Sequence, residues 1–316
     1  MQTREFRHLE NAAALEALKK ESTLPAPTEV VMGLGSSVIA KSLFPLFLKV
    51  IFLLCLMMVS SSGNAQMEKW DSLTNQAKFY HQQKEYAKSN ECYEHVIAIV
   101  KPYDEGERLT SKIRGMIALN YVYLGVPLFK DKKYAESKPY FEKALEYSAK
   151  DPKVLPMANS WMGNWYSSQA LEIRVKGSDL QKAIDYYIMA ENYYKLANAP
   201  EKYMKEQISR ATTLSEISRI DEAIKLLQQV IQECEKMDKL FIIQAKALNE
   251  LGAIELNLEN YQAAIQYLEK SYNLSFQSDR QNARIAVNRI IRLYEAQIPD
   301  KSKVELWKKR VVELED

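Results

Sequence analysis

The sequence predicts an all-α fold in which antiparallel helix pairs stack along an array, and three observations favour this class. Gly is scarce, with 9 in 316 residues, and Gly weakens helix interiors because its backbone is so free. From Gln66 onward, apolar and small residues recur at three- and four-residue spacing, which is the period of an amphipathic helix. The same order of large and small residues also returns along the chain, which indicates internal repeats.

Segment 42–65 has the parts of a secretory signal peptide. Lys49 precedes an apolar run, VIFLLCLMMV at 50–59, and small residues end at Ala65. We therefore expect cleavage after Ala65 and export to the periplasm or the cell surface. The exported part would be one helical domain, residues 66–316.

An alternative for the same region stays open. The segment could remain as an inner-membrane anchor, with membrane contact only through residues 43–59. A spanning helix needs about 20 apolar residues, and Lys49 and Pro45 interrupt this one. Residues 1–41 are too long for the start of a signal peptide. We expect this extension to be disordered or an artefact of the gene model, with translation starting near Met32.

The repeated motif is clearest at residues 248–271. A Leu-Gly pair ending at Gly252 is followed by Tyr261, by the small residue Ala264 and by the bulky Leu268. Small residues let two helices approach closely, and bulky ones fill the groove between them. The same frame fits further segments, in which the small residue of the second helix is Ser89, Ser137, Ala183 and Ala223.

These residues resemble the tetratricopeptide repeat family, and the intervals between the small positions exceed its consensus of about 34 residues. The chain is thus similar to the long-helix variants found in exported proteins of the Bacteroidetes type. The resemblance implies a right-handed superhelical α-solenoid of about five repeats, with a capping pair near 279–296 and 300–315. The stretched third repeat requires longer helices or a longer turn. Pro127 departs from the pattern and predicts a kink or an end in its helix.

The resemblance also assigns roles to single positions. Small residues at the contact between paired helices are implied at Ala77, Ser89, Gly125, Ser137, Gly163, Ala183, Ala211, Ala223, Gly252 and Ala264. The first helices line a concave groove, where the family's ligands lie, and the implied lining is Thr74, Lys78, Val122, Val126, Ser160, Asn164, Ile208, Thr212, Asn249 and Ala253. These positions do not reproduce the lysine and asparagine succession with which some members hold a C-terminal carboxylate, so we expect no such clamp.

The charge balance argues against a nucleic-acid partner. Lys and Arg number 43 against 41 Asp and Glu, whereas nucleic-acid-binding domains are strongly basic. The three cysteines form no disulfide framework, because one lies in the apolar N-terminal segment and Cys92 and Cys234 lie in well-separated repeats.

Catalytic motifs are missing from the sequence. There is no glycine-rich phosphate loop and no nucleophile with a neighbouring base, and Cys92 with His95 would supply only two metal ligands. We expect no enzyme, metal or cofactor, and instead an adaptor or scaffold that binds a protein or peptide in the groove. The alternative is a sensory module of a membrane-anchored regulator. Of the Trp161 and Trp165 pair, one is expected to pack and the other to be exposed as an anchor for the partner.

Overall fold

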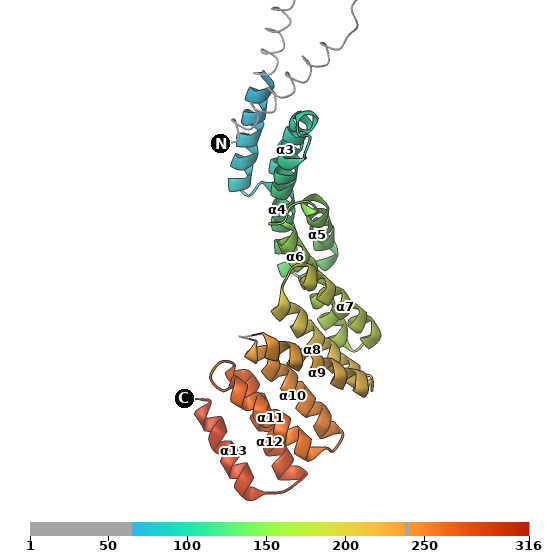
Figure 1. Ribbon diagram of the computed structural model, residues 1–316, viewed down its shortest axis with the longest axis vertical. Helices are drawn as coiled ribbons and strands as arrows, with labels where there is room; N and C mark the ends of the chain where they lie inside the picture. Colours follow the sequence, from blue (N-terminus) through green and yellow to red (C-terminus); the bar gives the residue numbers. More distant parts are fainter. Residues whose placement is uncertain (1–64, 238–239, 316) are drawn as a thin grey trace, which may run out of the picture. The chain divides into compact units, whose positions relative to one another are not determined.

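The computed structural model describes residues 65–237 and 240–315, and all regular elements in these ranges are helices (Figure 1). The predicted extension, signal peptide and membrane anchor lie outside the described residues, apart from Ala65. No helix formed by the described residues has the length and apolar character that crossing a membrane requires.

The helices alternate between a first member (A) and a second member (B) of successive pairs, joined by short connections. This confirms the predicted α-solenoid of helix pairs, and the expected capping pair corresponds to the last A and B helices. The A helices are residues 65–82, α4 (Arg108–Lys130), α6 (Leu155–Lys176), α8 (Pro200–Glu216), α10 (Phe241–Asn257) and α12 (Arg280–Ala296). The B helices are α3 (Tyr86–Val100), α5 (Tyr134–Ser148), α7 (Leu180–Leu196), α9 (Ile220–Lys236), α11 (Tyr261–Ser275) and α13 (Lys301–Glu313).

The chain divides into two compact units. The first contains the described residues up to Pro127 together with Lys143–Val154, and the second contains Leu128–Glu142 and the chain from Leu155 onward. In the second unit, each helix from α6 to α13 packs against the next one, and α10 also packs against α8 and α12. A helices of successive pairs therefore lie side by side, which is how neighbouring repeats stack in a solenoid.

A buried polar relay ties the helices of the first unit together. Ser89, on α3, donates a hydrogen bond to the backbone carbonyl of Ala77, at 2.8 Å. Asn120, on α4, donates in turn to the Ser89 hydroxyl, at 2.9 Å. All three residues are fully buried. The relay satisfies polar groups that would otherwise be costly to bury between three consecutive helices.

The third pair contains a long A helix, as the stretched spacing predicted, since α6 runs over 22 residues. Helix α4 is 23 residues long and continues through Pro127 to Lys130. Of the two outcomes predicted for Pro127, a kink or an end, the end of the helix does not occur. Proline removes a single N–H group, and at this exposed position only part of a turn remains beyond it, so the local loss does not stop the helix.

Most turns from an A helix to its B helix share one backbone geometry. In four of the six described turns a residue just past the A helix is left-handed, and the next N–H bonds the carbonyl five residues back, as from Lys133 to Leu128 at 2.9 Å. This is the Schellman ending, which satisfies carbonyl groups at the helix end. The α6–α7 turn uses Gly177, with φ of 63°, and the α12–α13 turn contains no left-handed residue. The left-handed residues that are not glycine are Lys84, Lys132, Ser218 and Glu259.

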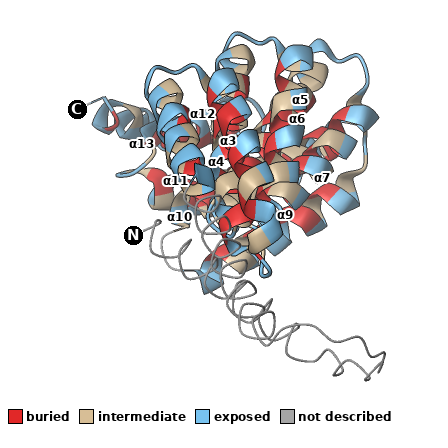
Figure 2. Ribbon diagram, turned by 90° about the horizontal axis from the view of Figure 1, so that it is seen from above, coloured by how far each residue is buried: buried red, intermediate tan, exposed pale blue. Residues whose placement is uncertain are grey.

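Each helix carries its buried residues along one side (Figure 2). All the positions at which the sequence implies close helix contact are buried. A Cβ added at Gly163 would lie 2.7 Å from the ring of Tyr194, and one added at Gly252 would lie 2.8 Å from the side chain of Leu268. At both glycines the B helix therefore touches the backbone of the A helix.

Candidate functional site

A cavity of about 410 Å³ opens on the face that the A helices of the second unit form. Helices α6, α8, α10 and α12 all contribute to its lining, and no B helix does. Ile208 and Ile285 are its apolar members, and Ile285 is 41% exposed. The remaining lining residues are charged or polar, so the cavity offers both kinds of contact to a ligand.

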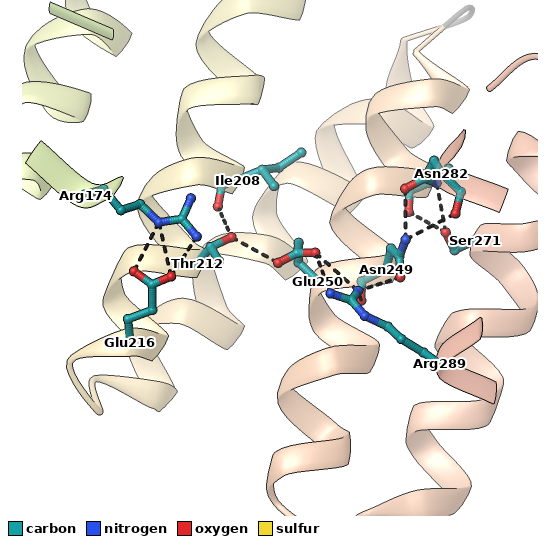
Figure 3. Close-up of polar contacts among 10 residues, drawn as sticks. Arg174, Ile208, Thr212, Glu216, Asn249, Glu250, Ser271, Asn282 and Arg289 are labelled. Carbon is teal, nitrogen blue, oxygen red and sulfur yellow. Dashed lines mark hydrogen bonds and ion pairs between the residues drawn. The ribbon is translucent and has the colours of Figure 1, made fainter. Parts of the chain in front are cut away.

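A chain of hydrogen bonds crosses this face from α8 to α12 (Figure 3). Thr212 donates to a carboxylate oxygen of Glu250, at 3.2 Å. The guanidinium of Arg289 donates to Glu250 at 3.3 Å and to the side-chain oxygen of Asn249 at 2.6 Å. The Asn249 amide then donates to Asn282, at 2.9 Å. Each A helix is thus fixed to the next by polar side chains as well as by apolar packing.

The chain ends in a buried relay of the kind found in the first unit. Asn282 donates to the hydroxyl of Ser271, on α11, at 3.1 Å, and Ser271 donates to the backbone carbonyl of Ala245, at 2.7 Å. Ser271 is fully buried. Both units therefore contain the same kind of relay. In each, a serine of a B helix bonds the backbone carbonyl of its own A helix and accepts from an asparagine of the A helix that follows.

Ion pairs flank the cavity. Arg174 donates from two nitrogen atoms to Glu216, at 2.7 and 3.1 Å, and this carboxylate raises the pKa of the guanidinium. Lys246 pairs with Asp279 at 3.2 Å. With Arg289 facing Glu250, positive and negative groups alternate across the face. A ligand with one uniform charge would find no matching surface here.

Lys202, in the first turn of α8, has only neutral hydrogen-bond partners. Its ammonium donates to the Ser160 hydroxyl at 2.8 Å and to the Asn164 side-chain oxygen at 3.3 Å, and it lies 5.3 Å from the centre of the Tyr194 ring. Burial lowers the pKa of Lys202. A half-buried cation held by neutral groups gains from pairing with a carboxylate, so Lys202 can accept an acidic group from a partner.

Two buried carboxyl groups lie beneath the same helices. Glu206, on α8, accepts a hydrogen bond from the Ser167 hydroxyl at 2.9 Å, and burial, with a smaller contribution from nearby Glu191, raises its pKa to about 7. Burial also raises the pKa of Glu191 to about 7, although Arg210 lies 2.8 Å away and opposes the shift. Both groups are therefore partly protonated near neutral pH.

The structure brings some of the predicted groove positions together and separates others. Ile208, Thr212 and Asn249 line the cavity. Asn249 is 2% exposed, and its side chain is hydrogen-bonded to both Asn282 and Arg289. It therefore stabilises the cavity lining and offers no free amide to a ligand. The remaining positions are Thr74, Lys78, Val122 and Val126 in the first unit, Ser160 and Asn164 beside Lys202, and Ala253, which lies on α10 outside the cavity lining.

Sequence reasoning missed the contribution of α12, because this helix matches the repeat motif poorly and was interpreted as a cap. A signal was present. Ala283 and Ala286 mark the buried side of the helix, so Asn282, Ile285 and Arg289, which share another side at three- and four-residue spacing, should face the groove. The network confirms this placement for Asn282 and Arg289.

The two tryptophans of α6 do not divide as predicted. Trp165 is buried and donates its indole N–H to the backbone carbonyl of Tyr134, at 2.9 Å. Trp161 is half-buried and stacks on Phe141, with ring centres 5.8 Å apart. The prediction of an exposed anchor is wrong, because neighbouring aromatic residues such as Phe129 cover Trp161.

Comparison with known families agrees with this architecture. The tetratricopeptide repeat model matches residues 120–151 and 245–278, which contain most of the α4–α5 and α10–α11 pairs. These two segments are thus similar to tetratricopeptide repeats, in agreement with the stacked helix pairs. No curated protein matches the chain.

Several solved structures are similar to the chain. BtubC (BKLC) from P. vanneervenii is 15% identical, with 77% of this chain and 91% of that chain covered and a TM-score of 0.49. PilF of Pseudomonas aeruginosa is 11% identical, with 78% and 99% covered and a TM-score of 0.32. The TPR2AB domain of yeast Sti1, in complex with pHSP90, is 14% identical, with 78% and 98% covered and a TM-score of 0.25.

Proposed function

We propose that this chain is a non-catalytic scaffold that binds a protein or peptide partner on the A-helix face of its second unit. The observation that carries the proposal is the cavity that α6, α8, α10 and α12 line together. Ile208 and Ile285 supply apolar surface there, and charged groups surround them. The segments that match tetratricopeptide repeats support the same function, because stacked repeats present extended binding surfaces.

The arrangement suits an extended segment with an apolar side chain and an acidic group. Lys202 and Thr212 lie ten positions apart on α8, which is about 15 Å along a helix axis. About five extended residues cover this length. An apolar side chain in the cavity that Thr212 and Ile285 line, and a carboxylate beside Lys202, could therefore belong to one peptide.

Affinity capture with the full chain tests this surface. Extracts of the native host would be passed over the wild type, Ile285→Glu and Lys202→Glu, and captured proteins would be quantified by mass spectrometry. We expect a partner whose recovery falls about tenfold or more in both variants, because each removes a contact of roughly 1.4 kcal/mol or more. Lys301→Glu, on the exposed side of α13, is the control. Equal recovery by all of these proteins would overturn the proposal.

We also propose that the scaffold is exported. The basic, apolar and small-residue parts of segment 42–65 support this location. N-terminal sequencing of the native protein after cell fractionation tests it. A start at Gln66 in a soluble envelope or secreted fraction is the expected result. An intact N-terminus in the membrane fraction would instead favour the sensory module of an anchored regulator.

A further inference from the structure

A second and larger cavity, of about 630 Å³, lies between the B helices α9 and α11. Its contribution from α10 is Gln244, Leu248 and Leu251. The A-face cavity uses Asn249 and Glu250 of the same helix. With about 100° between successive residues, these two sets lie on opposite sides of α10, so the two cavities are separate sites.

The groove between the earlier B helices α5 and α7 contains a cluster of aromatic rings. Tyr193, on α7, stacks on Tyr166 of α6 with ring centres 5.6 Å apart. Tyr186 meets the same Tyr166 ring edge to face, also at 5.6 Å. The ammonium of Lys138, from α5, lies over this cluster, 5.8 Å from the Tyr166 ring.

The later groove is open because two of these rings are absent from it. When the repeats are aligned on their buried small residues, Leu274 stands where the earlier pair has Tyr193. Glu255 likewise stands where the earlier pair has Tyr166. The open volume therefore follows from a difference in sequence between repeats of the same fold.

The open groove combines an apolar floor with amide walls. Leu248 and Leu251 are almost fully buried, and they line the bottom of the groove. Gln228 and Gln232, one turn apart on α9, face Asn273 of α11 across it, and these three side chains are exposed. A primary amide both donates and accepts, so it can pair with the N–H and C=O groups of a peptide backbone.

Opposite charges stand on the two walls. Glu235, on α9, accepts a hydrogen bond from Gln244 at 3.3 Å, and Lys270 lies on α11. Both charged side chains are exposed. The groove therefore favours a ligand that carries a basic group toward α9 and an acidic group toward α11.

We propose that this groove binds a peptide segment in extended conformation, with an apolar side chain on the leucine floor, a basic residue toward Glu235 and an acidic residue toward Lys270. The extended form follows from the amide walls. A helical ligand satisfies its own backbone and would leave the glutamine and asparagine side chains without partners.

Selection from a phage-displayed library of random nine-residue peptides on the full 316-residue chain tests the proposal. We expect enrichment of peptides with an apolar residue between a basic and an acidic one. Leu274→Tyr, which supplies the ring that the α6–α7 pair has at this position, should weaken a selected synthetic peptide about tenfold or more in fluorescence polarisation. On Lys270→Glu, selection should replace the acidic residue by a basic one. The A-face variant Ile285→Glu should leave the affinity unchanged.

Two results would overturn this inference. One is a selection without enrichment. The other is a set of peptides whose affinity is unchanged by Leu274→Tyr and lowered by Ile285→Glu. That result would support binding at the A-face cavity alone, so this inference can be overturned while the proposed function stands. Circular dichroism checks that Leu274→Tyr is folded. If it is not, the exposed double substitution Gln232→Ala with Asn273→Ala replaces it, and unchanged affinity in that protein would equally overturn the inference.

Discussion

Burial governs the protonation of Glu206, which lies beneath the A-helix face. Its pKa is raised to about 7 because desolvation outweighs the hydrogen bond from Ser167. A carboxyl group whose pKa is higher in the folded state stabilises that state when protonated. Its contribution is fully present below the unfolded pKa, near 4.5, and is lost as pH rises through about 7.

Glu206→Gln should therefore change stability in a pH-dependent manner. At pH 4 the wild-type carboxyl group is largely protonated in both the folded and the unfolded state and resembles an amide, so the variant should unfold at nearly the same urea concentration. At pH 8 the variant should be more stable by up to about 3 kcal/mol, since one pKa unit is worth about 1.4 kcal/mol. Urea unfolding at both pH values measures this, with exposed Glu305→Gln as the control. A stability difference between the variant and the wild type that is the same at both pH values would contradict the prediction.

Gly163 illustrates how little space separates paired helices. The ring of Tyr194 lies against its Cα, and the Tyr194 hydroxyl donates to Asn164 at 2.9 Å, so the ring cannot move away cheaply. Gly163→Ala should lower stability by about 1–3 kcal/mol, the usual range for overpacking. Gly106→Ala is the matched control, because nothing lies within 4 Å of its added Cβ. Equal urea midpoints for the two variants would show that the Tyr194 ring moves aside without a cost in stability, which would contradict the prediction.

At the scale of the element, five of the A-to-B turns combine a left-handed residue with variable sequence. Lys132, Ser218 and Glu259 adopt left-handed backbone conformations that cost an L-residue roughly 1–2 kcal/mol. Gly177 occupies the equivalent conformation without this cost. The positions were not predictable from the sequence, because glycine, the usual marker of such a turn, is present at only one of these turns.

Glycine should therefore stabilise the turns. Lys132→Gly and Glu259→Gly are each expected to raise the free energy of unfolding by up to about 1 kcal/mol, since they relieve the strain and lose part of the gain to the flexibility of the unfolded chain. Gln266→Gly, at an exposed interior position of α11, is the contrasting control and should lose about 1 kcal/mol. Thermal unfolding followed by circular dichroism measures whether each variant is more or less stable than the wild type.

At the scale of the whole molecule, contacts are made mainly between neighbouring helices, and the chain forms two compact units. Stability in such arrays is approximately a sum of local terms. Asn120→Ala, which breaks the relay of the first unit, should speed hydrogen exchange in residues 65–127 and leave 240–315 unchanged. Asn282→Ala should do the reverse. Mass spectrometry of exchange at the peptide level tests both, and parallel changes in both regions would indicate one cooperative unit.

The sequence predicted the fold well because repetition supplies independent evidence at each pair. Small residues such as Ala183 and Ala264 mark the B helices, and a stretched spacing correctly foretold the long α6. The candidate site was predicted only in part. Thr212 follows from the repeat register, whereas Arg174 and Arg289 depend on long side chains reaching neighbouring helices, which a local pattern does not encode.

The hydrogen-bond chain from Thr212 through Glu250 to Arg289 has a consequence for the order of the pairs. Small residues at the helix contacts recur from pair to pair, as at Ala183, Ala223 and Ala264. The threonine, the carboxylate and the guanidinium, in contrast, each stand on a different A helix. Exchanging the α8–α9 and α10–α11 pairs would break this line. The polar contacts on this face therefore depend on the order of the helix pairs, whereas identical repeats would make the same contacts in any order.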